Sequence, residues 1–147
     1  MPTIAGAMTI EENVHIVLIG PDGKIKDVRK ISNTVTTAGK NGTADQLLAA
    51  PTLAKPGWMA IGTGTPAATL LGLEISRVAF TTKTRATNVV TMVGDYAAGV
   101  GTGAITEAGI FDVVTANTIN MWADQSFAVV NKLAADTLSI SWTLTYA

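Results

Sequence analysis

The last segment of the chain alternates between apolar and polar residues more regularly than any other. In TLSISWTLTYA at 137–147, the residues Leu138, Ile140, Trp142 and Leu144 occupy every second position, with Ser or Thr between them. Successive side chains of a strand point to opposite faces, so this period of two predicts a half-buried β-strand. We therefore expect Leu138, Ile140, Trp142 and Leu144 to lie in the core.

Shorter β-rich segments separated by turn residues occupy most of the remaining chain. Pro21, Asp22 and Gly23 predict the turn of a β-hairpin over 13–31, because proline presets φ for a turn and glycine accepts a positive φ. Further strands are predicted from their β-branched content at 58–62, 76–85, 88–96, 103–112, 117–123 and 126–133.

One short helix is predicted between the hairpin and the later strands. Residues 32–42 are polar and are expected to form a connection. Thr43 can cap a helix over 44–50 that Pro51 ends, and we expect Leu47 and Leu48 to pack inward from it.

About eight or nine strands with short turns and one helix indicate an all-β fold. We expect an antiparallel β-sandwich, jelly-roll-like, or a barrel. The 147 residues fit a single domain over 12–147. Residues 1–11 lack a clear periodicity and are predicted to form an extended arm.

The composition indicates that neighbouring protein subunits cover part of this protein's surface. Charged residues make up 14% of the chain, against about 25% in ordinary soluble domains. We expect a protein that lives in an assembly, the alternative being a monomer with an unusually uncharged surface. The net charge of −1 gives no bulk attraction for nucleic acid. The longest charge-free run, 56–73, carries Gly and Pro and is not expected to span a membrane.

The residues that usually carry chemistry are scarce. There is no cysteine and one histidine, His15, so the sequence offers neither a Cys-ligated metal site nor a hydrolase triad. The glycine-rich GTGTP at 62–66 lacks the lysine of a phosphate loop. The carboxylates that could pair for glycoside hydrolysis are scattered: Asp95, Glu107, Asp112 and Asp124. We expect no catalytic residue, no cofactor and no metal.

Glu107 is an isolated acid in the apolar segment GAITEAGIFD at 103–112. A carboxylate on a half-buried strand needs an opposite charge or several N–H donors. Arg77 is similarly isolated in LEISRVAF at 73–80. The hypothesis is that Glu107 and Arg77 form a structural ion pair between adjacent strands.

Four segments occur in a distinctive order: IGTGTP at 61–66, LEISRVAF at 73–80, AITEAGIFD at 104–112 and FAVVNKLAADTLSISWTLTY at 127–146. This ordered set resembles a family of small virion proteins of tailed bacteriophages. The resemblance covers 58–147, and 11–50 matches loosely. It implies an all-β, non-enzymatic component of a phage particle, either capsid-associated or tail-fibre-like.

Within that family we expect a capsid decoration, or cement, protein, because the chain is one compact domain without coiled-coil heptads or a fibrous stalk. It would be made in the bacterial cytoplasm, form a trimer or dimer, and bind the major capsid protein on the outer surface of the virion, with no nucleic acid or membrane as partner. Ile4, Met8 and Ile10 of the arm would hold a neighbouring subunit.

Three alternatives remain at this point. The first is a tail, baseplate or fibre-associated protein of the same virion. The second is a carbohydrate-binding β-sandwich, which would need an exposed aromatic platform from Trp58 or Trp122. The third is an enzyme, for which the sequence offers the least support.

Overall fold

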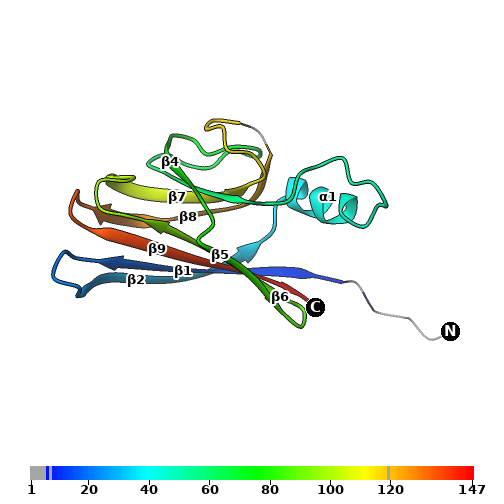
Figure 1. Ribbon diagram of the computed structural model, residues 1–147, viewed down its shortest axis with the longest axis horizontal. Coiled ribbons are helices and arrows are strands. Elements are labelled where there is room, and N and C mark those ends of the chain that lie inside the picture. Colours follow the sequence, from blue (N-terminus) through cyan, green and yellow to red (C-terminus); the bar gives the residue numbers. More distant parts are fainter. Residues whose placement is uncertain (1–5, 7, 119) are drawn as a thin grey trace.

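The computed structural model describes residue 6, residues 8–118 and residues 120–147. In these residues nine β-strands form two antiparallel sheets that pack face to face, with one α-helix at the end of the sandwich (Figure 1). The predicted all-β sandwich with one short helix is confirmed. Ile4 of the predicted arm lies outside the described residues. No helix in the described part of the chain is long and apolar enough to cross a membrane.

The first sheet has five strands in the order β2-β1-β9-β6-β5. Their bounds are β1 (Ile10–Ile19), β2 (Ile25–Thr34), β5 (Thr82–Ala86), β6 (Val89–Tyr96) and β9 (Thr137–Tyr146). The predicted hairpin is β1–β2, with Gly23 at a φ of 79° in its turn. Strand β1 begins inside the predicted arm, and Ile10 pairs with Tyr146 and packs against the core. Ile10 therefore belongs to the sandwich and not to an extended arm, so the predicted boundary of the arm at residue 11 is wrong.

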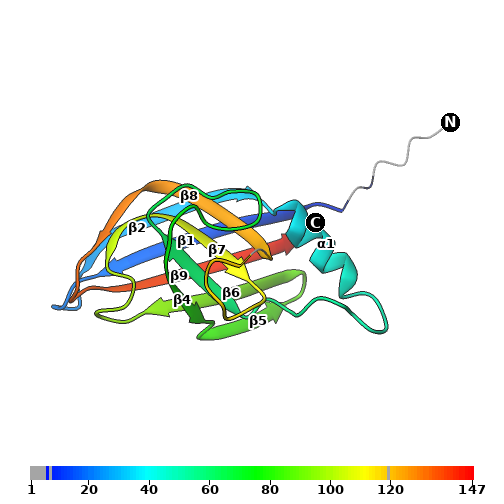
Figure 2. The ribbon, with the colours of Figure 1, turned by 90° about the horizontal axis from the view of Figure 1, so that it is seen from above.

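The second sheet has four strands in the order β4-β3-β7-β8. Figure 2 shows the sandwich from above, with β4, β7 and β8 of this sheet labelled. Their bounds are β3 (Trp58–Gly62), β4 (Glu74–Ala79), β7 (Gly103–Phe111) and β8 (Met121–Lys132). The segments 117–123 and 126–133, predicted as two strands, belong largely to the single strand β8. Register shifts in its pairing with β7 interrupt the alternation of apolar and polar residues from which a strand is predicted.

The segment 76–85 was predicted as one strand and is two strands in different sheets. The N–H of Phe80 donates to the carbonyl of Gly57, whereas the N–H of Thr81 donates to the carbonyl of Val93. The chain thus passes from the second sheet to the first between these two residues. Residues of high β-propensity continue through the crossing, so composition gives no sign of it.

The helix α1 spans Thr37–Asp45, earlier than predicted. Thr36 caps it, because its Oγ1 accepts the N–H of Gly39 at 2.9 Å. The same hydroxyl lies 2.7 Å from the carbonyl of Trp122, which ties the start of α1 to β8. Leu47 and Leu48 follow the helix and are 86% and 57% exposed, so their predicted inward packing is wrong.

The main core lies between the two sheets. Leu138, Ile140, Trp142 and Leu144 all belong to it, with exposures from 0 to 7%, as the alternation predicts. A second, smaller apolar cluster lies apart from it and contains Ala60, Leu71, Phe111 and Met121, with Trp58 packed against them. These residues come from β3, β7, β8 and the loop before β4, so the second sheet buries side chains on both faces.

Candidate functional site

Two connections cover the outer face of the second sheet. Residues 63–73 join β3 to β4, and the segment 112–120, of which all but residue 119 is described, joins β7 to β8. Figure 1 shows the described parts of both over this sheet, on the side away from the first sheet. Isolated charged side chains are buried beneath them. The geometry of these charges decides what this region can do.

Glu107 is fully buried on β7 and anchors the first of these connections. Its Oε1 accepts the N–H of Gly64 at 3.0 Å and the N–H of Leu73 at 2.8 Å, and its Oε2 accepts the N–H of Gly72 at 2.8 Å. The neighbouring Thr106 hydroxyl donates to the carbonyl of Gly64 at 2.7 Å. One carboxylate thus binds both ends of the 63–73 loop, and three donors satisfy it.

The predicted ion pair between Glu107 and Arg77 is wrong. Strand β3 lies between β4 and β7, with Arg77 opposite Ala60 and Glu107 opposite Gly62. The two side chains are therefore not on adjacent strands. The Glu107 carboxylate is instead satisfied by several backbone N–H donors, the other arrangement that a buried carboxylate can adopt.

Arg77 pairs instead with Glu74 on its own strand. The Nε and Nη2 atoms lie 2.8 Å from the two carboxylate oxygens, and both side chains are nearly fully buried. The guanidinium carbon lies 3.8 Å from the centre of the Phe111 ring. Its Nη1 donates to the carbonyls of Val113 and Thr115 at 3.0 and 2.8 Å. Arg77 therefore fixes the second connection as Glu107 fixes the first.

Glycines let the 63–73 loop approach its anchor. A Cβ on Gly64 would lie 2.7 Å from the amide nitrogen of Leu73, and a Cβ on Gly72 would meet the backbone of Thr65. Only glycine fits such close backbone contacts. The glycines of the GTGTP segment therefore allow the loop to pack closely around the Glu107 carboxylate. This packing accounts for the glycine-rich sequence without a phosphate ligand.

Three of the four segments that carry the resemblance meet around these two anchors. IGTGTP supplies Gly64, LEISRVAF supplies the Glu74–Arg77 pair, and AITEAGIFD supplies Glu107 and Phe111. A general base must reach a proton of the substrate. Here the carboxylate of Glu107 is covered by the loop whose N–H groups it accepts. The arrangement holds two surface loops in place.

A second buried acid, Glu12 on β1, was missed by the sequence analysis. Glu12 is fully buried, and its Oε2 accepts the Trp142 Nε1–H at 3.0 Å. Its Oε1 has no hydrogen-bond partner in the described part of the chain. Burial raises the pKa of Glu12 to about 8, with a smaller contribution from the nearby Asp124 carboxylate. The sequence did carry a signal of this burial. Glu12 is two residues before Val14 and four before Ile16, so on a strand its side chain points to the same face as these core residues.

The remaining candidates are dispersed. His15 and Asp95 are exposed on β1 and β6, Asp112 is buried, and Asp124 is half-buried on β8, where burial raises its pKa. No group of three His, Cys, Asp or Glu side chains in the described residues could hold a metal ion.

The two tryptophans considered for a carbohydrate platform are covered. Trp122 is 7% exposed, and Trp58 is half-buried against the second, smaller apolar cluster. Trp122 therefore offers no exposed ring for stacking on a sugar, and Trp58 offers a partly covered one.

Comparison of the chain with family models, with curated proteins and with solved structures gives no match. The resemblance to phage virion proteins therefore stays a prediction from the four segments.

Proposed function

We propose that the protein is a non-enzymatic structural component of a bacteriophage virion, and specifically a decoration protein. It is made in the bacterial cytoplasm, associates as a trimer or dimer, and binds the major capsid protein on the outer surface of the shell, which it stabilises. The observation that carries this proposal is the grouping of exposed apolar side chains on a surface with few charges.

Most of the exposed large apolar side chains lie in three places. Met8, Leu47 and Leu48 lie beside α1; Ile25, Val129 and Leu133 lie where β2 approaches β8; Leu73 and Ile75 lie at β4. Val28 is exposed on the face of the first sheet that points away from the second, since it pairs with Val17. In the second group, Arg29 reaches the carbonyl of Val129 and Lys26 reaches Asp136, so the two sheet edges are adjacent there. Grouped apolar exposure is typical of surfaces that bind other proteins. Several such areas suit a subunit with several neighbours.

The buried charges also favour a structural role. Glu107 and Arg77 direct their hydrogen bonds to loops of their own chain, which fixes the shape of the outer surface. The exposed Leu73 follows directly on a loop residue held by Glu107. A fixed surface loses less conformational entropy when it binds a lattice.

The copy number per virion tests this proposal. Quantitative mass spectrometry of purified particles would compare the protein with the major capsid protein. A number of copies equal to that of the capsid protein, or a simple fraction of it, is expected for decoration of the whole shell. A few to a few dozen copies would place the protein in the tail or at a vertex instead. Absence from particles would overturn the virion role itself.

A further inference from the structure

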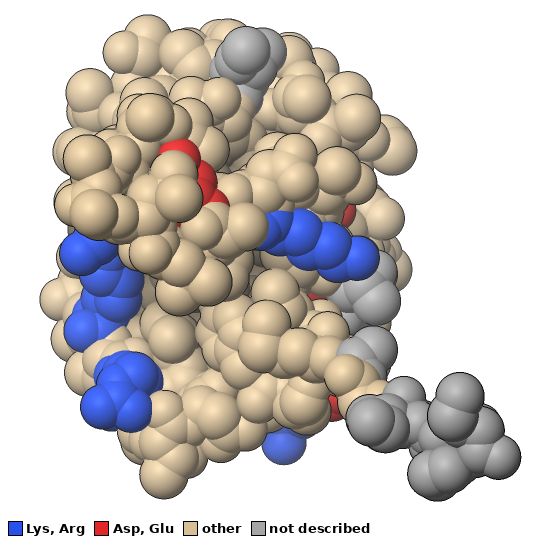
Figure 3. All heavy atoms as spheres, turned by 90° about the vertical axis from the view of Figure 1, so that its right-hand side faces the viewer, with Lys and Arg blue, Asp and Glu red and all other residues tan. Residues whose placement is uncertain are grey.

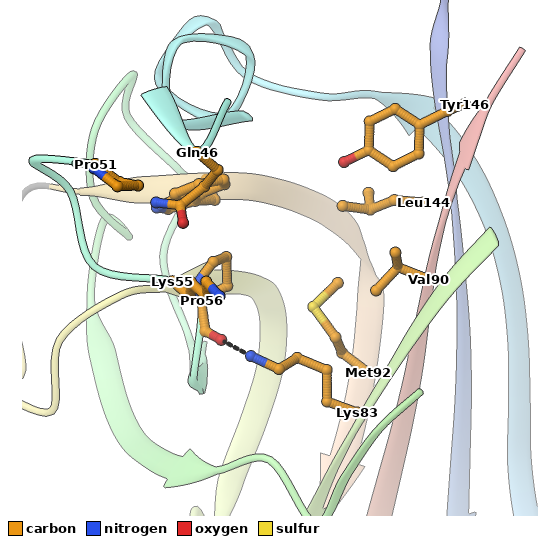
Figure 4. Close-up of a pocket in the computed structure, with 10 residues that line it drawn as sticks. Gln46, Pro51, Lys55, Pro56, Lys83, Val90, Met92, Leu144 and Tyr146 are labelled. Atoms are coloured by element: carbon orange, nitrogen blue, oxygen red, sulfur yellow. Dashed lines mark hydrogen bonds between the residues drawn. The ribbon is translucent and has the colours of Figure 1, made fainter. Parts of the chain in front are cut away.

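A cleft of about 330 Å³ opens at the end of the sandwich, beside α1. Figure 4 shows its two walls: Pro51 and Pro56 come from the segment after α1, and Val90, Met92 and Leu144 come from β6 and β9. Trp122 of β8 also lines it. We refer to this feature as the α1-end cleft. Its lining is mostly apolar, and its size suits a few side chains of a peptide.

The apolar surface continues outside the cleft. Leu47 and Leu48 follow Gln46, which lines the cleft, and both are exposed. Leu47 also lines a neighbouring groove together with Met8, which is 69% exposed. An extended segment lying over this end would therefore cover apolar surface both inside and beside the cleft.

The charges at this end are mainly positive. Lys55 and Lys83 line the cleft, and Lys40 lines the neighbouring groove. Asp45, an acid at the end of α1, accepts the N–H groups of Thr52 and Leu53, so its carboxylate is directed to its own chain. Figure 3 looks onto this end and shows Lys and Arg side chains around a largely uncharged surface, with little acidic surface in view.

We infer that the α1-end cleft binds an extended segment of a different protein, in which an apolar side chain is flanked by carboxylates. The inference rests on the proposed function, because it takes the partner to be another protein of the virion. The apolar side chain would enter between Pro51 and Met92, and the carboxylates would lie near Lys55 and Lys83. Lys83 already donates to the carbonyl of Pro56 at 2.7 Å, and an ammonium group has donors to spare.

Charge decides between this partner and a second copy. In a two-fold contact the same patch occurs on both sides. Two copies whose contact was centred on the cleft would bring Lys55 and Lys83 of each subunit close to the same lysines of the other. Like charges facing each other disfavour association, whereas an acidic segment gains from every one of them.

Rebinding to particles that lack the protein tests the inference. The probe is a particle of the source phage with the gene deleted, titrated with purified full-length protein. The variant Lys55→Glu/Lys83→Glu is expected to bind at least tenfold more weakly than the wild type. The control Lys30→Glu is compared with Lys55→Glu alone. It makes the same change in net charge at an exposed residue on the face of the first sheet that points away from the second, and it should bind as the wild type does.

Two further variants guard against misfolding and against the second-copy alternative. Lys55→Glu alone changes an exposed side chain, and Leu47→Ser/Leu48→Ser removes the apolar surface beside the cleft. The fold of each is checked by circular dichroism and its oligomeric state by sedimentation. Both should keep the fold and the oligomeric state and should bind particles at least fivefold more weakly, as expected for residues at the centre of an interface.

The outcomes separate the two proposals. Weak binding by the cleft variants together with normal binding by the control supports the inference. Equal binding by all variants overturns the inference and leaves the decoration role standing. Dissociation of an oligomer by Leu47→Ser/Leu48→Ser would make this end a self-contact and also overturn it. Failure of the wild type itself to bind would reject the decoration role, and the inference with it.

Discussion

Replacing Glu12 with glutamine should change how stability depends on pH. The Glu12 carboxyl is fully buried between the sheets, and Oε2 accepts the Trp142 Nε1–H. Glutamine has nearly the same shape and keeps an amide oxygen for this hydrogen bond, but it does not titrate. The comparison therefore isolates the cost of the ionisable group.

The magnitude follows from the shift in pKa. The pKa of Glu12 is about 8 in the folded protein, against an ordinary value of 4.5, mainly because burial disfavours the charged form. A group with a raised pKa contributes stability that is fully present below pH 4.5 and is lost as the pH rises to about 8. At about 1.4 kcal/mol per pH unit, the loss at pH 7 is about 3 kcal/mol. Glu12→Gln should then be more stable than the wild type at pH 7 and not at pH 4.

Urea unfolding at pH 4, 5.5, 7 and 8.5, followed by tryptophan fluorescence, measures this difference. The control is Glu11→Gln, on the adjacent and exposed position of β1, which should run parallel to the wild type. The stability difference between Glu12→Gln and the wild type should widen from pH 4 to pH 7. A constant difference over this range would refute the reasoning, since Glu12 would then have the same charge in the folded and unfolded states.

Further substitutions test the two anchors and the contact of α1 with Trp122 by unfolding. Glu107→Ala leaves three loop N–H groups without an acceptor and should lower the free energy of unfolding by about 3 kcal/mol or more, with Glu107→Gln intermediate. Arg77→Met leaves the buried Glu74 carboxylate without its ion-pair partner and should lower the free energy of unfolding by about 3–5 kcal/mol. The double variant Arg77→Met/Glu74→Gln should recover part of this loss, because it also removes the buried charge. Gly42→Ala adds a Cβ against the Trp122 ring and should cost about 1–3 kcal/mol, shown by a lower Tm.

Most strands could be predicted because each leaves a local pattern. The alternation at 137–147 and the turn at Gly23 both appear in the structure as predicted. The crossing at Phe80–Thr81 could not be predicted, because it depends on which sheet each backbone N–H joins. The helix was misplaced because Thr43 and Thr36 are equally good caps in sequence. What decides is that the Thr36 hydroxyl also reaches β8, which is distant in the chain.

The site shows the same limit more sharply. The sequence correctly indicated that the Glu107 carboxylate needs partners on its strand, and it named the wrong one. An arginine is visible in a sequence, whereas backbone N–H groups are present at almost every residue and give no signal. Gly64 and Gly72, whose lack of a side chain lets the loop come close to Glu107, are the nearest thing to such a signal in the sequence. An isolated acid in an apolar strand and a glycine-rich loop are therefore best considered together.

The two anchors also bear on how the surface could bind. Without Glu107, the 63–73 connection would keep the apolar contact of Leu71 and the hydrogen bond from the Thr106 hydroxyl, but it would lose the acceptor for three of its N–H groups. Hydrogen bonds to buried charges are directional, so they fix the backbone of each loop where apolar contacts alone would allow sliding. The apolar Leu73 and Ile75 are then presented in one arrangement before any partner arrives. Under the proposed decoration role, such preorganisation would raise the affinity at every lattice site, because less ordering remains to be done on binding.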